Sequence, residues 1–323
     1  MDLNAIAEFL TATIRMSTPI ILAGLAATTG ERAGVLNIGL EGMMLIGACS
    51  GAVCSFFSGS ALVGILGAVL IGVVVGYIFS IFTVRFHGNQ AVVSVALNIL
   101  SVGLTTLVST LVWQNRGASS WLPSVGHFEI PLLSKIPFLG DVIGKLSPVI
   151  YLTLILVLVL RWALFRTWWG LRLRSVGENP LAAQTVGLNV YRTRTVALLI
   201  SGALCGLAGA YLSIDQLNVF TKNMSAGRGY LAYAANIFGQ WNPLGVYASG
   251  LIFGAMEAVQ MRVQSIGIPS QLAQMIPYVV TILAVTFNFK KTVGPAAVGD
   301  PYVQNISKSK RKTRRRVTGG DRS

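Results

Sequence analysis

The feature that most constrains this chain is a series of continuous apolar runs, each long enough to cross a bilayer. A bilayer-spanning helix needs about 20 mostly apolar residues, and only helices or closed barrels satisfy their backbone hydrogen bonds in lipid. The runs are continuous instead of alternating, which favours helices. Of the 323 residues, 53% are hydrophobic and 11% are charged, whereas soluble domains carry about 25% charged residues. The sequence therefore predicts an all-α, polytopic integral membrane protein.

The runs predict about nine transmembrane helices, within a range of eight to ten. They lie at 3–29, 31–57, 61–84, 91–113, 148–164, 195–214, 225–245, 244–261 and 271–289. Arg15 and Pro19 interrupt the first run, so an interfacial placement of the part before Arg15 stays open. The seventh run is too short for a comfortable span. Short, glycine-punctuated segments are typical of broken helices beside a transport pathway.

Basic residues predict the orientation, because Lys and Arg gather on the cytoplasmic side of membrane proteins. The loop at Arg85, the loop 166–194 and the tail 303–323 should share that side, which leaves the loop 114–147 outside. The chain thus divides into a transmembrane domain, residues 1–302, and a basic cytoplasmic tail. The net charge is +14. We expect the basic block from Lys308 to Arg316 to touch anionic lipid and not nucleic acid.

The loop 166–194 carries the signals of a short helix. Asn179 suits an N-cap, Pro180 suits the first helical position, and Gly187 suits a left-handed C-terminal cap. A helix of about two turns is not stable alone in water. Either the membrane domain or a partner protein must therefore hold it. The residues predicted to make this element are Glu178, Asn179, Pro180, Ala182, Ala183 and Gly187.

Polar residues within the apolar runs are few. At the second run, Glu31 and Arg32 can stay in the headgroup region, whereas Glu41 is costly unless it faces a wet cavity or a partner. Gly39 and Gly42 would let another backbone approach closely. The candidate pathway residues are Asn37, Glu41, Asn98, Asn236, Glu257 and Gln274. A hydrogen bond between helices is the alternative reading for each of them.

One spacing of residues occurs twice in the sequence. Gly88 precedes Asn98 by ten residues, and Gly267 precedes Pro277 by ten, in segments that enter from opposite sides. Opposite entry fits an inverted repeat, which many transporters use. In a glycine-rich chain, chance explains the same spacing.

Several kinds of chemistry have no motif in this sequence. It contains no phosphate-binding loop, nucleophile elbow, His/Glu zinc motif or dinucleotide fingerprint. Cys49, Cys54 and Cys205 lie in apolar runs without metal-ligand spacing, which indicates packing residues. We therefore expect no catalytic residue, metal site, cofactor or enzymatic activity in this chain. The intramembrane polar residues also lack the several buried charges typical of an ion-coupled carrier.

Several stretches together resemble the permeases of ABC transporters. They are Glu31-Arg-Ala-Gly-Val-Leu-Asn-Ile-Gly-Leu-Glu-Gly-Met-Met44, Gly177-Glu-Asn-Pro180-Leu-Ala-Ala183, Gly227-Arg-Gly229 with Ile237-Phe-Gly239 and Asn242-Pro-Leu-Gly245, and Gly294-Pro-Ala-Ala-Val-Gly-Asp-Pro-Tyr302. The resemblance covers about residues 15–302 and is greatest to the permeases of bacterial nucleoside importers, which are near the ribose and branched-chain amino-acid permeases. The ribose-type permeases lack the Asn-Ile-Gly-Leu-Glu-Gly-Met pattern, so that stretch carries the nucleoside assignment.

The resemblance implies a transport subunit in the bacterial inner membrane. A second related permease subunit would complete the channel, a cytoplasmic ATP-binding subunit would supply energy, and an extracellular substrate-binding lipoprotein would deliver the nucleoside. The helix opening at Pro180 would then be the coupling helix that contacts the ATPase. From the residues alone, a self-sufficient secondary carrier or channel for a small polar solute remains the alternative.

Overall fold

A computed structural model describes residues 3–115, 117–126, 128–129, 144–265, 269–287 and 294–303. The basic block of the predicted tail and much of the predicted outer loop lie outside the described residues. So do parts of the predicted ninth helix and Gly267.

The described chain is helical apart from one pair of very short strands. Its long helices are α1 (Leu3–Arg32), α2 (Leu40–Ser58), α3 (Ala61–Ser80), α4 (Gln90–Trp113), α6 (Pro148–Arg166), α9 (Val190–Ala210) and α11 (Pro243–Ser265). Its shorter helices are α7 (Trp168–Glu178), α8 (Pro180–Thr185), α10 (Arg228–Phe238), α12 (Ser270–Ala273) and α13 (Ile276–Phe287). Two π-helical turns, η1 (Ile81–Arg85) and η2 (Tyr211–Gln216), extend α3 and α9. Strands β1 (Phe128–Glu129) and β2 (Lys145–Leu146) pair antiparallel, with Phe128 opposite Leu146.

The all-α membrane class is confirmed, but the expected number of spans is not. Among the described residues, seven helices are long and apolar enough to cross a membrane. The predicted seventh segment forms α10, which has only 11 residues because the chain before it, 217–227, is not helical. The predicted ninth segment is described only as α12 and as α13, which has 12 residues. Neither α10 nor α13 reaches the length of a full span.

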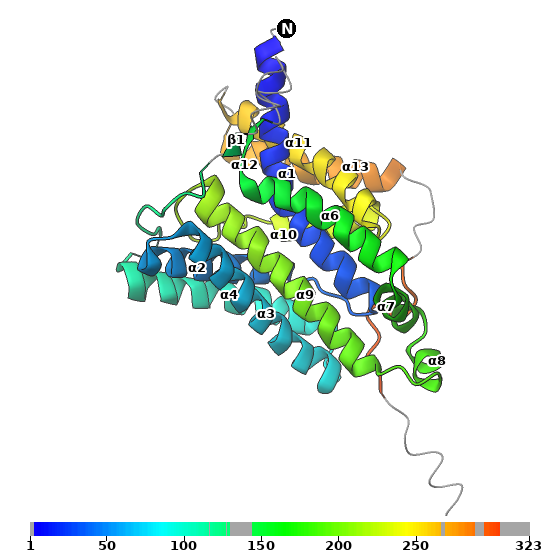
Figure 1. The fold of residues 1–323 in the computed structure, drawn as a ribbon. Helices are drawn as coiled ribbons and strands as arrows, with labels where there is room; N and C mark the ends of the chain where they lie inside the picture. The colour runs from blue at the N-terminus through cyan, green and yellow to red at the C-terminus, as the bar shows by residue number, and fades with distance from the viewer. Residues whose placement is uncertain are drawn as a thin grey trace, which may run out of the picture.

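Helix α1 continues without a break through Arg15 and Pro19, so an interfacial first part is not observed (Figure 1). Pro19 has no N–H to offer the carbonyl of Arg15, four residues earlier. The hydroxyl of Tyr211 donates to that carbonyl at 3.1 Å instead. A residue of η2 therefore satisfies the backbone group that the proline leaves free.

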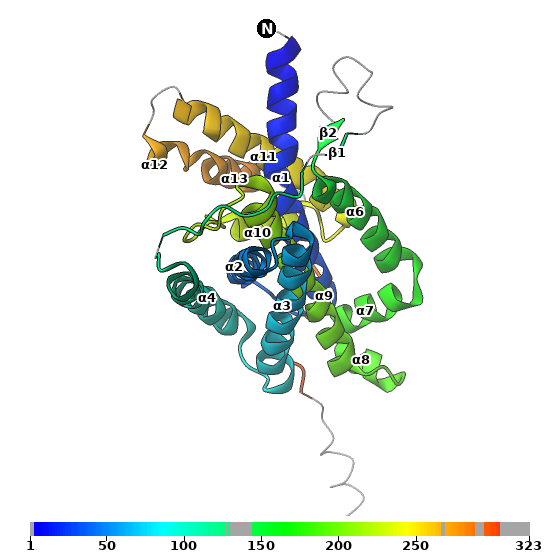
Figure 2. The same ribbon diagram turned by 60° about the vertical axis from the view of Figure 1, so that its left-hand side comes forward.

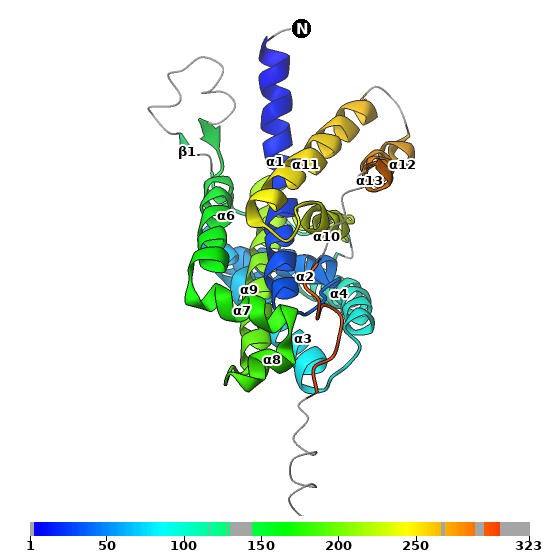
Figure 3. The same cartoon turned by 90° about the vertical axis from the view of Figure 1, so that its right-hand side faces the viewer.

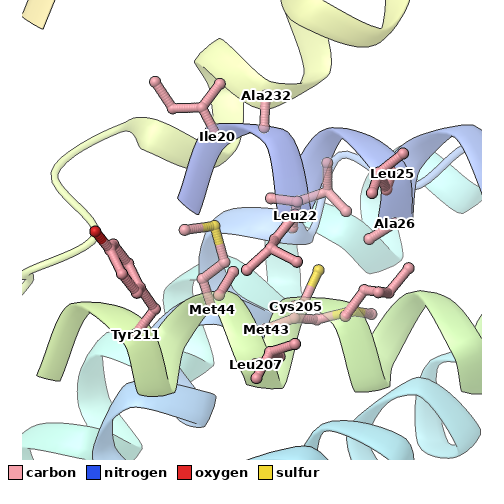
Figure 4. Close-up of a cluster of buried hydrophobic side chains, with 14 of the residues drawn as sticks. Ile20, Leu22, Leu25, Ala26, Met43, Met44, Cys205, Leu207, Tyr211 and Ala232 are labelled. Carbon is pink, nitrogen blue, oxygen red and sulfur yellow. The ribbon is translucent and has the colours of Figure 1, made fainter. Parts of the chain in front are cut away.

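The core forms around α1 and α9, which run antiparallel: Arg15 meets Tyr211 near one end, and Gly30 meets Leu198 near the other. Figure 4 shows side chains of α1, α2 and α9 interdigitating here, among them Leu22, Met43 and Cys205, all fully buried. Cys49 is also buried, Cys54 is half-buried, and all three cysteines are free thiols, as packing residues are.

Each central helix packs on a helix from the other end of the sequence. Helix α1 packs along α11, and α9 packs along α3. The α9–α3 contact is backbone to backbone, because a Cβ on Gly202 would lie 2.2 Å from the carbonyl oxygen of Gly72. This reciprocal packing is what an inverted repeat would give, and the repeat itself stays a prediction.

The two ends of the molecule differ. The N-terminal end of α1 projects from one end, whereas α7, α8 and the segment 294–303 lie at the opposite end (Figures 1 and 3). The turn after α3 lies at that same end, since His87 Nε2 is 3.2 Å from the hydroxyl of Tyr191 at the start of α9. The loop at Arg85 and the loop 166–194 therefore lie at the same end of the described molecule, and the side of the membrane that this end faces stays a prediction.

Candidate translocation pathway and coupling surface

The chain between α1 and α2, residues 33–39, is not helical and has no hydrogen-bond ladder of its own. Ala33, Gly34 and Val35 donate back to the end of α1, and helix α4 supplies partners for two of the residues that follow. Leu36 N–H donates to Gln90 Oε1 at 2.6 Å, and Ile38 N–H donates to Ser94 Oγ at 3.2 Å. Backbone groups at membrane depth must be satisfied within the protein. Helix α4 is therefore polar toward the protein and apolar outward; its buried residues are Gln90, Ser94, Asn98, Ser101, Thr105 and Ser109.

Glu41 uses both carboxylate oxygens to hold the start of α10. Oε1 accepts from Gly227 N–H at 2.8 Å, and Oε2 accepts from Gly229 N–H at 2.7 Å. A helix N-terminus has unpaired N–H groups and a partial positive charge, which a carboxylate satisfies. Glu41 also lies in the first turn of α2. The Glu41 carboxylate thus serves the N-termini of two helices. The N–H groups at the start of α10 stabilise it in its buried position.

The chain reaches α10 through the non-helical segment 217–227, which the outer loop holds. Ser119 N–H donates to Phe220 O, and Leu122 N–H donates to Asn218 O, each at 2.8 Å. Backbone pairing with residues 117–122 therefore fixes the approach to α10. The same backbone groups would otherwise be left unpaired.

Further polar side chains meet at the start of α10. Arg228 Nε lies 3.0 Å from Glu257 Oε2 in α11. Asn98 Nδ2 donates to the hydroxyl of Tyr230 at 3.1 Å. The hydroxyl of Tyr278 in α13 lies against Gly227, where a Cβ would approach it to 2.2 Å. We call the set of Glu41, Asn98, Arg228, Tyr230, Glu257 and Tyr278 the junction cluster.

A second polar group, the Glu31 cluster, lies at the other end of α10 and comprises Thr28, Glu31, Asn236 and Trp241. Asn236 Nδ2 donates to Glu31 Oε2 at 2.9 Å, and Trp241 Nε1 donates to the same oxygen. Thr28 Oγ1 donates to Asn236 Oδ1 at 2.7 Å. Glu31, expected in the headgroup region, is covered by protein, and its depth in the bilayer stays a prediction. Its side chain is 1% exposed because α10 and the turn after it cover the end of α1.

The structure brings three of the six predicted pathway residues together. Glu41, Asn98 and Glu257 belong to the junction cluster, and Asn236 belongs to the Glu31 cluster. Asn37 lies in the break before α2, where Oδ1 accepts from Gly39 N–H at 3.0 Å. Gln274 stands apart, exposed in the turn between α12 and α13.

Sequence reasoning missed three members of the junction cluster: Arg228, Tyr230 and Tyr278. For the first two a signal was available. Arg228 is a charged residue between two glycines at the start of a short apolar segment, and Tyr230 follows directly. Tyr278 carried no such signal, because a tyrosine in an apolar run is common.

The predicted coupling helix forms as α8, with the predicted cap geometry. Asn179 Oδ1 accepts from Ala182 N–H at 3.0 Å, and Pro180 is the first helical residue. Gly187 follows the helix with a φ of +87°, the left-handed conformation that favours glycine. Leu188 N–H then donates to Ala183 O at 3.1 Å, which closes the C-terminal turn.

The chain itself packs against α8, which is one of the two ways of holding the helix that the sequence left open. Ala183 is buried against Val176, Val190 and Tyr302, and the Tyr302 hydroxyl donates to Gln184 Oε1. Burial of Tyr302 raises the pKa of its phenol above the ordinary value, so the phenol stays a neutral donor. Ala183 therefore supports α8 from behind and presents no contact to a partner. The exposed residues of α8 and its two ends are Glu178, Asn179, Leu181, Ala182, Thr185, Val186 and Gly187.

The segment 294–303 completes this surface. Ala297 N–H donates to Gly177 O at 2.9 Å, and Arg194 Nη1 donates to Asp300 O at 3.3 Å. Arg194, expected in a polar loop, is 1% exposed because this segment covers it. A cavity of about 400 Å³ lies between α8 and the segment, lined by Glu178, Asn179, Pro180, Leu181, Ala296, Ala297, Asp300, Pro301, Tyr302 and Val303.

Comparison with known proteins identifies relatives of this chain. Residues 9–285 match the family described as branched-chain amino acid transport system / permease component. The chain is 35% identical over 300 residues to the nucleoside ABC transporter permease protein NupC of Lactococcus lactis, covering 90% of this chain and 94% of the relative. It is 35% identical over 307 residues to the guanosine ABC transporter permease protein NupQ of Bacillus subtilis, covering 91% and 95%.

A more distant relative, 23% identical over 299 residues with coverage of 87% and 77%, is the glucose ABC transporter permease protein TsgB13 of Haloferax volcanii. No solved structure matches the chain. The family match and the two closer relatives extend over nearly the whole transmembrane domain. The chain belongs to the family of branched-chain amino acid transport system permease components, and it is a multi-pass transport subunit of an ABC transporter.

Proposed function

We propose that this chain is a permease subunit of an ATP-driven importer of nucleosides. The observation that carries the proposal is the 35% identity, over about nine-tenths of the chain, to permeases named for nucleosides and for guanosine. The stretch from Glu31 to Met44, which suggested nucleosides, supports it because that stretch contains Glu41 and builds the break before α2.

The proposed assembly places this chain in a bacterial cell membrane with three partners: a second related permease, a cytoplasmic ATP-binding subunit and an extracellular substrate-binding lipoprotein. The end of the molecule that carries α8 faces the cytoplasm. Exposed arginines support this orientation, since Arg85, Arg166, Arg172 and Arg192 all lie at that end. The C-terminus is then cytoplasmic as well.

In this assembly α8 transmits ATP hydrolysis to the membrane domain. Its outer side offers Leu181, 53% exposed, and Val186, 77% exposed, in a helix that is already fixed in position. A preformed element binds a partner without an ordering cost. The contact between the two subunits is therefore expected on Leu181, Ala182, Thr185 and Val186.

Leu181→Glu tests this contact, with Leu181→Met as the matched control that keeps an apolar side chain. Losing a hot-spot contact in an interface costs about 2 kcal/mol or more, and about 1.4 kcal/mol is tenfold in binding. Leu181→Glu should reach the membrane, lose the ATP-binding subunit in a pull-down, and stop importing. Association and import at the level of Leu181→Met would locate the coupling contact elsewhere.

Deletion of the gene in its native host tests the function itself. Uptake of labelled purine and pyrimidine nucleosides should disappear and return with a plasmid copy, whereas uptake of labelled glucose should not change. Loss of glucose uptake with nucleoside uptake intact would favour a sugar importer instead. Nucleoside accumulation by liposomes that contain this chain alone would point to the self-sufficient carrier.

A further inference from the structure

We propose that Tyr230 and Tyr278 form a stacking site for the base of the nucleoside as it crosses the membrane domain. This inference rests on the proposed function and assigns a site within it. The two side chains come from α10 and α13, and both belong to the junction cluster. With α4, these helices lie along one side of the molecule (Figures 2 and 3).

The exposure of the two rings is unusual for their depth. Tyr230 is 46% exposed and Tyr278 is 42% exposed, although the polar residues beside them, Glu41, Asn98 and Glu257, are all buried. Tyrosines that face lipid gather at the two ends of a membrane span. These two lie away from the ends of α4, because Tyr230 meets Asn98, which is about 12 Å along the helix axis from its first residue, Gln90.

The length of α10 also helps to locate the start of this helix. Arg228 precedes Asn236 by eight residues, so it lies about 12 Å further from the Glu31 cluster along the helix axis. The start of α10 therefore lies well away from the end of the molecule that holds the Glu31 cluster. A face that receives a polar, aromatic solute accounts for both the depth and the exposure.

The hydroxyl groups point into the protein and leave the rings free. The Tyr230 hydroxyl accepts from Asn98 Nδ2, and the Tyr278 hydroxyl lies against Gly227. The hydrogen bond from Asn98 holds the Tyr230 phenol at its polar end, and the Tyr278 hydroxyl packs on the backbone of the same turn. A nucleobase can then stack on the exposed rings, and stacking on an aromatic side chain tolerates every base because each base has a π-face.

The surrounding charges suit the rest of a nucleoside. Arg228 is paired with Glu257, and the Glu41 carboxylate accepts from two backbone N–H groups, so none of these charges requires a charged solute as its partner. Ser225 Oγ, in the turn before α10, is fully buried and has no hydrogen-bond partner in the part of the chain that the structure describes. These features favour a neutral solute with an aromatic ring and hydroxyl groups, which is the chemistry of a nucleoside.

The test uses uptake by the native host, with variants expressed in the deletion strain. Labelled nucleoside is supplied at a concentration that saturates uptake by the wild type, so that delivery to the permease does not limit the rate. Each tyrosine is changed to Phe, which keeps the ring, and to Leu, which removes it. Tyr77→Leu is the matched control, because Tyr77 is 45% exposed on α3, which contributes nothing to the junction cluster.

We expect Tyr230→Leu and Tyr278→Leu each to lower the rate at least fivefold, since a stacked base is worth about 1–3 kcal/mol. The Phe variants and Tyr77→Leu should stay within about twofold of the wild type. Leu variants that import like Tyr77→Leu would overturn the stacking site. So would Phe variants as slow as the Leu variants, because the hydroxyl and not the ring would then matter.

A binding measurement covers the case in which a Leu variant fails to reach the membrane. Tyr230→Trp keeps an aromatic ring, and guanosine added to the purified complex should quench its additional fluorescence, whereas ribose should not. Equal response to guanosine and ribose, or to neither, would overturn the site. If the wild type does not take up nucleosides, the proposed function fails; if it does and the variants behave like Tyr77→Leu, only the stacking site fails.

Discussion

Two buried carboxylates hold α10, one at each end, and they do so in different ways. Glu41 accepts two backbone N–H groups at the start of the helix, where its charge meets the positive end of the helix dipole. Glu31 accepts two side-chain donors at the end of the helix, where the dipole gives it no help. Glu31 Oε1 has no hydrogen-bond partner among the described residues.

The fold around α10 should therefore depend more on Glu41 than on Glu31. The N–H groups of Gly227 and Gly229 are fixed parts of the backbone, so only an acceptor at the position of Glu41 can satisfy them. Asn236 and Trp241 can rotate toward other partners. Substitutions at the start of α10 should therefore destabilise the protein more than substitutions at its end.

The strongest way to break the junction is to separate α2 from α10. Gly229→Ala would place a Cβ 2.5 Å from the backbone nitrogen of Glu41 and 2.6 Å from its Cα. Neither backbone atom can move without shifting a helix, so we expect a loss of folded protein larger than the usual overpacking cost of about 1–3 kcal/mol. Size-exclusion chromatography of the detergent-solubilised protein measures it.

Gly103→Ala provides the control, because a Cβ at Gly103 in α4 would meet nothing within 4 Å. Alanine is also the better helix former, so this variant should be neutral or slightly stabilised. Equal yields for the two variants would show that α2 and α10 do not approach as closely as the structure has them.

The next largest effect compares the carboxylates directly. In Glu41→Gln, the amide offers one acceptor and places a donor against a backbone N–H group, so one charge-assisted hydrogen bond is lost at about 1.5–3 kcal/mol. In Glu31→Gln, the amide oxygen can still accept from both Asn236 and Trp241, so we expect the smaller cost of a neutral hydrogen bond, about 0.5–1.5 kcal/mol. Thermal unfolding of the two purified variants in one detergent gives the order, and a lower Tm for Glu31→Gln would reverse it.

The smallest effect expected concerns the ion pair. Arg228→Lys keeps the charge near Glu257 but loses the Nε contact at 3.0 Å, and lysine does not reproduce arginine geometry. We expect a drop in Tm smaller than that of Glu41→Gln. A larger drop would show that the ion pair, and not the Glu41 carboxylate, fixes the start of α10.

The sequence predicted the parts of this fold that the bilayer imposes. Lipid leaves few ways to arrange a long apolar run, so the helical class and most of the long helices could be predicted, whereas the number of about nine spans is not confirmed. The short helix α8 could also be predicted, because its capping residues Asn179, Pro180 and Gly187 lie within a few residues of one another.

Long-range partners could not be predicted in this way. Glu41 was marked as costly, but its partners are backbone groups up to 188 residues away and have no side chain that would reveal them. The burial of Ala183 and Arg194 depends on Tyr302 and on the segment 294–303, which fold back from the other end of the chain. The polar stripe of α4 was present in the sequence at helical spacing, from Gln90 to Ser109, and could have been recognised.

The central claim is that the start of α10 faces the path of the solute. Cysteine labelling tests it most directly, because a thiol reacts as its thiolate and so needs water. Tyr230→Cys, in a background in which Cys49, Cys54 and Cys205 are replaced by Ala, should react with a membrane-impermeant thiol reagent in the assembled transporter, and saturating nucleoside should slow the reaction. Tyr77→Cys in the same background should not react. No reaction at position 230, or a rate that nucleoside leaves unchanged, would contradict the account.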